Sequence, residues 1–121
     1  MLELRNIHKY YNPGTVNEMC LFEDFNLTIN QGEFVSVVGS NGSGKTSMLN
    51  IICGSIPVES GQILIDGSNI RSVALPDLRA AIGIVEQQAF LFTGSILDNI
   101  RLGRPMATQE EVVAAARNAN A

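Results

Sequence analysis

The stretch Gly39-Ser40-Asn41-Gly42-Ser43-Gly44-Lys45-Thr46-Ser47 decides the fold of this sequence. Its first eight residues match G-x-x-x-x-G-K-[ST], in which glycines let successive backbone amides turn toward one point and bind an anion. Lys45 adds a positive charge for the β- and γ-phosphates of a nucleotide, and Thr46 adds a hydroxyl oxygen that suits Mg²⁺. Ser47 can direct a hydroxyl toward the α-phosphate. The stretch therefore predicts a loop that binds the phosphates of a nucleotide.

This pattern is informative only between a strand and a helix. Residues 34–38 are rich in β-branched side chains, which predicts a short strand buried on both faces. Residues 45–53 carry apolar side chains at helical spacing, and Gly54 is suited to end that helix. Such a helix would direct the positive end of its dipole at the loop.

The remaining segments predict a mixed α/β protein. Alternating apolar and polar residues indicate strands at 2–11, 21–29 and 62–65, and residues 82–85 read as a further strand. A short helix is expected at 76–81, and the pair Thr108 and Glu111 forms a capping-box pattern before a helix from Glu110 to about Arg117. We expect a P-loop NTPase core beside an antiparallel β part made from about 1–31 and 61–70.

Composition narrows the function classes. With 121 residues, of which 45% are hydrophobic and 17% charged, the sequence predicts a folded domain or part of one and excludes intrinsic disorder. A net charge of −4 gives no support for nucleic-acid binding, and a single histidine, His8, argues against a histidine metal site or a Ser-His-Asp triad. Cys20 and Cys53 lack metal-ligand spacing, and no apolar run approaches the roughly 18 residues that span a bilayer. We expect a cytoplasmic protein.

Several further features accompany the phosphate loop in a fixed order. They are Tyr11 after the first strand, Ser60-Gly61-Gln62-Ile63, Asp66-Gly67 and Val85-Glu86-Gln87. With the loop, this set resembles the ATP-binding subunits of ABC transporters over essentially the whole chain. The resemblance implies ATP and Mg²⁺ as cofactors. It also implies ATP hydrolysis coupled to membrane transport in the intact parent, with a transmembrane domain and a second ATP-binding domain as partners at the cytoplasmic face.

The resemblance also implies residue roles. Tyr11 would stack on adenine, with Tyr10 as the alternative one residue away. Lys45 and Gln87 would be catalytic, and Thr46 and Gln87 would bind Mg²⁺, with Gln88 competing for the role of Gln87. Residues 90–94 are too apolar for an ordinary surface loop and would contact the membrane-spanning partner, unless they pack in a core.

The sequence departs from the family pattern in what it lacks. It has no L-S-G-G-Q segment and no apolar run that ends in Asp-Glu, both of which the family layout places beyond Ala121. Residues 1–121 would therefore be a partial ABC-type nucleotide-binding domain, about its first half. We expect weak binding of ATP-Mg²⁺ or of phosphate alone, little turnover, and self-association through uncovered surface.

Other interpretations stay open at this point. Residues 8–20 look like importer-type or lipoprotein-type ATPases and residues 91–100 like exporter-type ones, so an engineered join after Gly67 is an option. A GTPase would need N-K-x-D, which is absent, and a kinase lid would have only Arg101 and Arg104 to use. An engineered or fragmentary P-loop scaffold without transport activity is the non-enzymatic alternative.

Overall fold

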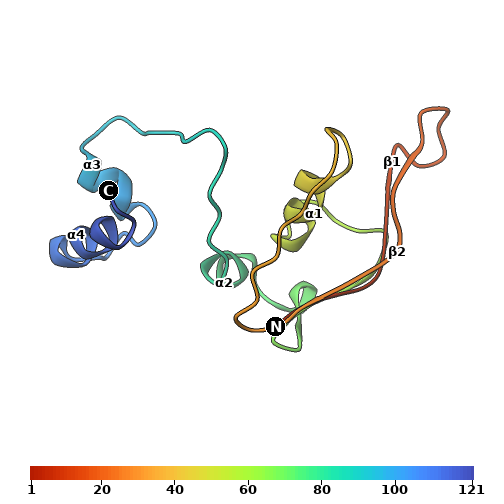
Figure 1. Ribbon diagram of the computed structural model, residues 1–121, viewed down its shortest axis with the longest axis horizontal. Helices are drawn as coiled ribbons and strands as arrows, with labels where there is room; N and C mark the ends of the chain where they lie inside the picture. The colour runs from red at the N-terminus through yellow and green to blue at the C-terminus, as the bar shows by residue number, and fades with distance from the viewer. The chain divides into compact units, whose positions relative to one another are not determined.

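The computed structural model describes residues 1–121, which divide into two compact units, Met1–Gly83 and Ile84–Ala121. The first unit contains four strands and three short helices: β1 (Leu2–Tyr11), β2 (Met19–Ile29), α1 (Lys45–Ile52), β3 (Ser60–Ile65), β4 (Ser68–Asn69), the 3-10 helix η1 (Ile70–Ser72) and α2 (Leu75–Ala80). The second unit contains α3 (Ile96–Arg101) and α4 (Gln109–Asn118). Figure 1 shows these elements along the chain.

The strands form one antiparallel sheet in the order β2-β1-β3-β4. The central strand β1 pairs with β2 on one side and with β3 on the other, and its register shifts where bulges interrupt both ladders. Gly61 of β3 lies at such a bulge with φ of +100°, and a Cβ on it would lie 2.5 Å from the carbonyl oxygen of Asn6. The predicted antiparallel β part is confirmed.

Helix α1 packs on this sheet through the core. Leu4 and Ile7 of β1, Ile51 of α1 and Ile63 of β3 form one buried apolar cluster. Burying a side chain such as Ile51 stabilises a fold by about 1.5–3 kcal/mol. The cluster therefore anchors α1, and with it the glycine-rich loop that precedes this helix, to the central strand.

Two predicted strands are absent. Residues 34–38 and 82–85 have no strand conformation, and their side chains are mostly exposed, with Phe34 at 97% and Val85 at 98%. A strand needs a hydrogen-bonded neighbour, and β1–β4 pair only with one another. Both runs are apolar, but no neighbouring strand is available to either of them. The predicted strand of the P-loop core is therefore wrong for this structure, while the mixture of helices with a sheet agrees with the α/β class.

The helices follow their local signals. The predicted helix 45–53 is confirmed as α1, 76–81 as α2 with Pro76 in its first turn, and 110–117 as α4. Thr108 caps α4 in a complete capping box with Glu111. Helix α3 was not predicted, although Ser95 and Asp98 form the same capping box. None of the helices has both the length and the apolar character needed to cross a bilayer.

Candidate functional site

Glycines shape the loop between residues 39 and 44. Gly42 and Gly44 have φ of +83° and +90°, in the left-handed region that favours glycine. A Cβ on Gly44 would lie 2.8 Å from Cδ1 of Leu21 in β2, and one on Gly39 would lie 2.6 Å from Oγ of Ser43. The loop therefore packs closely against itself at Gly39 and against β2 at Gly44, and a side chain at either position would force neighbouring atoms to move.

The N-terminus of α1 has no cap. Its N-cap residue is Gly44, no side chain accepts a capping hydrogen bond from the amides of its first turn, and that turn contains no acidic residue. The first bond of the helix runs from the amide of Met48 to the carbonyl of Gly44, at 2.9 Å. The amides of Lys45, Thr46 and Ser47 therefore have no acceptor within the helix, and the positive end of the helix dipole is not neutralised. This end can bind an anion.

The ammonium group of Lys45 lies at the loop. Its Nζ donates to the carbonyl oxygens of Gly39 at 2.6 Å and Ser40 at 2.7 Å, and to Oγ of Ser43 at 3.3 Å. An ammonium has three N–H donors, so the loop can engage all of them. The loop folds around the positive charge that the sequence pattern predicted for it.

Tyr11 reaches the same place from the end of β1. Its hydroxyl lies 3.0 Å from Oγ of Ser47, which joins β1 to the first turn of α1. Both residues line an open cavity of about 300 Å³. Its lining consists of Tyr11, Met19, Leu21, Asn41, Gly42, Gly44, Lys45, Thr46 and Ser47. Most of the predicted nucleotide-binding residues thus come together, and none of the lining residues is Asp, Glu or His.

Between the two neighbouring tyrosines, the geometry favours Tyr11. Tyr10 does not line the cavity and instead pairs across the ladder with Cys20 of β2. Cys20 raises the pKa of the Tyr10 phenol, mainly through charge repulsion and to a smaller extent through a hydrogen bond. Gly39, Ser40 and Ser43 flank the lining and hold Lys45.

The other predicted residues lie in the second unit. Gln87 and Gln88 are exposed there, and their predicted roles stay predictions. The segment 90–94 is also exposed, with Phe90 at 76%, and the rings of Phe90 and Phe92 meet edge to face at 4.9 Å. Core packing within this unit therefore does not account for its apolar side chains.

A buried cation that the sequence did not reveal lies beside the site. Lys9 of β1 is 7% exposed, its Nζ lies 3.0 Å from Oε1 of Glu59, and it lies over the ring of Tyr11 at 5.5 Å from the centroid. Burial raises the pKa of the Glu59 carboxyl, but hydrogen bonds from Lys9 and from the amide of Tyr10 prevail, and the pKa is lowered. A lysine between Ile7 and Tyr11 on one face of an alternating strand was the available signal.

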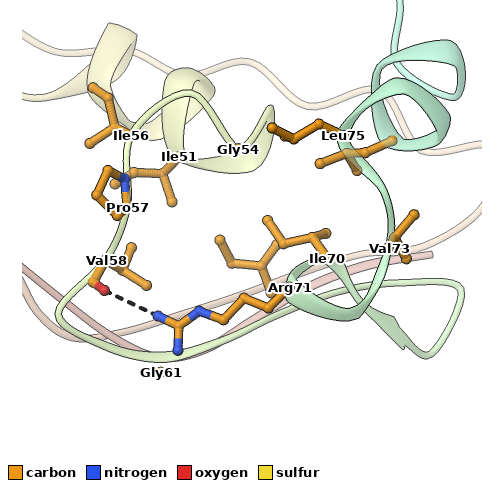
Figure 2. A pocket seen from close by; sticks show the side chains of 12 residues that line it. Ile51, Gly54, Ile56, Pro57, Val58, Gly61, Ile70, Arg71, Val73 and Leu75 are labelled. Carbon is orange, nitrogen blue, oxygen red and sulfur yellow. Dashed lines mark hydrogen bonds between the residues drawn. The ribbon is translucent and has the colours of Figure 1, made fainter.

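A second cavity, of about 280 Å³, lies between α1, β3 and α2. Figure 2 shows its mainly apolar lining and Arg71, which donates to the carbonyl oxygen of Val58 at 3.1 Å. None of the loop residues 39–47 lines it. This cavity is therefore separate from the nucleotide site that the sequence predicts.

Comparisons with known proteins agree with this geometry. The family model described as ABC transporter matches residues 22–121. Multidrug export ATP-binding/permease proteins of Staphylococcus aureus strains NCTC 8325 and COL are 45% identical to this chain over 120 residues, and one from the bovine strain RF122 is 44% identical. Each match covers 99% of this chain, including both segments with importer-like and exporter-like features. The chain spans about a fifth of the length of these relatives, 20% in each case.

Proposed function

Because this chain belongs to the ABC transporter family, we propose that residues 1–121 are part of a nucleotide-binding domain that binds ATP-Mg²⁺. In the parent protein this domain hydrolyses ATP and drives export across a membrane. The S. aureus proteins similar to this chain are named as multidrug export ATP-binding/permease proteins. These names support both the binding of ATP and outward transport. The parent would join the domain to a transmembrane domain and a second ATP-binding domain at the cytoplasmic face. The family match argues against the alternative that this chain is a kinase or GTPase of another P-loop family.

The observation that carries this proposal is the uncapped start of α1 beside the ammonium of Lys45. Free amides, a helix dipole and a lysine provide three sources of attraction for one polyphosphate. The backbone of the glycine-rich loop would hold the phosphates. The hydroxyl of Thr46 is a hard oxygen donor that fits Mg²⁺, and the ring of Tyr11 lines the same cavity and offers a surface for adenine. By the family pattern alone, Gln87 of the second unit would also bind Mg²⁺.

We further propose that this chain by itself turns over little ATP. Hydrolysis requires a positioned water and a group that accepts its proton, in addition to the phosphate cradle. The cavity at the loop is lined by no Asp, Glu or His. Bound Mg²⁺ would neutralise phosphate charge, but this chain's own residues at the cavity bind and orient rather than move a proton.

Calorimetric titration with ATP-Mg²⁺ tests the proposal. We expect binding by the native chain and a loss of at least about tenfold in affinity for Lys45→Ala, because a charge-assisted phosphate contact is removed. Arg79→Ala removes the same charge from exposed α2 and should leave the affinity unchanged. Equal affinities of the Lys45→Ala variant and the native chain would refute the assignment of the loop. Phosphate release at ordinary enzyme rates would refute the low turnover.

A further inference from the structure

We propose that Glu59 is a positioning residue that acts through Lys9 to fix the ring of Tyr11 for the base of a purine nucleotide. The inference rests on the proposed function and adds two residues outside the phosphate loop to it. Neither residue lines the cavity, and the lining residue that Lys9 contacts is Tyr11. Both residues lie near the end of β1, where the regular ladder with β3 stops.

Glu59 extends the contact with β1 beyond this ladder through one backbone and one side-chain hydrogen bond. The last pair between β1 and β3 joins His8 to Ser60, and β3 begins at Ser60. Glu59 donates its amide to the carbonyl of His8 at 3.1 Å, and its Oε2 accepts the amide of Tyr10 at 3.2 Å. The backbone on the N-terminal side of Tyr11 is therefore tied down by one residue that belongs to neither strand.

The carboxylate also holds Lys9. Its Oε1 lies 3.0 Å from Nζ of Lys9, and the side chains of Lys9 and Glu59 are 9% and 37% exposed, respectively. A cation with so little access to water is stable only with a partner, because removal of one member leaves an uncompensated charge. Without the charge of Glu59, the flexible Lys9 side chain should move its ammonium toward water.

Lys9 in turn restrains Tyr11. Its Nζ lies over the Tyr11 ring at 5.5 Å from the centroid, within the range of cation–π attraction. The hydroxyl of the same ring is held by Ser47 at 3.0 Å. The ring is thus fixed at one face and at its hydroxyl, which leaves the opposite face to stack on a base.

This arrangement acts on the base and not on the phosphates. Lys45 and the amides at the start of α1 make no hydrogen bond with Glu59 or Lys9. Loss of the pair should therefore weaken binding of ATP and spare binding of inorganic tripolyphosphate, which has the charge but no base. A change that merely loosened the fold would weaken both ligands.

The test is a calorimetric titration of the full 121-residue chain with ATP-Mg²⁺ and with tripolyphosphate-Mg²⁺. For Glu59→Gln we expect affinity for ATP to fall roughly 3- to 10-fold, part of the loss expected when a stacked aromatic is removed, and affinity for tripolyphosphate to stay unchanged. Glu110→Gln removes the same charge from exposed α4 and should change neither affinity. In a Tyr11→Ala background, Glu59→Gln should have no further effect.

A second variant guards against misfolding. Lys9→Met keeps the apolar stem without the charge, and we expect it to lose affinity for ATP alone, with far-UV circular dichroism like that of the native chain. Equal losses for ATP and tripolyphosphate, or no loss in either variant, would overturn the positioning role. If the native chain bound neither ligand, the proposed function itself would fall and this inference with it.

Discussion

Replacing Gly61 by alanine tests how closely β1 and β3 must approach. A Cβ on Gly61 would lie 2.5 Å from the carbonyl oxygen of Asn6 and 2.7 Å from that of Arg5. Both are backbone atoms of the central strand, so no side-chain rotation relieves the contact. Gly67 is the matched control, because it has φ of +80° but no atom within 4 Å of the place that a Cβ would take.

The cost follows from the distances. A carbon and a carbonyl oxygen approach to about 3.3 Å, so alanine at position 61 must separate the strands locally by roughly 0.8 Å. The bond from the Glu59 amide to the His8 carbonyl is 3.1 Å long and would stretch to about 3.9 Å, which breaks it. Losing it costs about 0.5–1.5 kcal/mol, and left-handed backbone at alanine costs about 1–2 kcal/mol.

We therefore expect Gly61→Ala to lower the free energy of unfolding by about 1.5–3.5 kcal/mol, and Gly67→Ala by about 1–2 kcal/mol. Urea unfolding followed by far-UV circular dichroism measures both. Coincident unfolding midpoints and slopes for the two variants would refute the reasoning that β1 and β3 are in tight contact at Gly61. A larger effect for Gly67→Ala would refute it as well.

Three other predictions follow from single contacts. Tyr11→Phe removes the hydroxyl bond to Ser47 but keeps the ring, so calorimetry should show a smaller loss of ATP affinity than for Tyr11→Ala. Asn99→Ala removes bonds to the amide and carbonyl of Phe92, so amide exchange in residues 92–95 should accelerate, whereas Asn118→Ala should leave it unchanged. The Thr108 amide, followed by Arg104, lowers the pKa of Glu111 in the folded state. Its stabilisation of α4 is therefore present above the ordinary carboxyl range and lost as pH falls through that range and below it, which circular dichroism of the native chain and of Glu111→Gln should detect.

The elements that sequence reasoning placed correctly have local causes. In β1 and β3, alternation marks the face that Leu4 and Ile63 bury. Gly44 and Gly54 bracket α1, and Thr108 starts α4. Each signal lies within a few residues of the element it defines, so one sequence is enough to find it.

The failures involve partners that are distant in sequence. The apolar run at 34–38 indicates a buried strand, but strand formation depends on neighbours that this chain does not provide. Lys9 reads as an exposed strand residue because its partner, Glu59, lies 50 residues away. The six-residue helix α3 is different, because the capping box of Ser95 and Asp98 that marks its start is a local signal within the sequence.

The candidate site shows the same division. The glycine pattern predicted the loop and the charge of Lys45, because both are encoded within nine consecutive residues. The contact between Tyr11 and Ser47 depends on how β1 lies beside α1, which the core cluster determines. Sequence reasoning could therefore propose Tyr10 or Tyr11, and the strand register was needed to separate them.

The bonds of Lys45 to its own loop bear on which solutes can compete for it. Because three oxygen atoms already surround the ammonium, an incoming anion must exchange places with them rather than simply arrive. Chloride, with a single diffuse charge, is poorly matched to that exchange, whereas a chain of phosphate groups supplies several strong acceptors at once. The loop should therefore discriminate against the abundant small ions of a cell before any base is recognised.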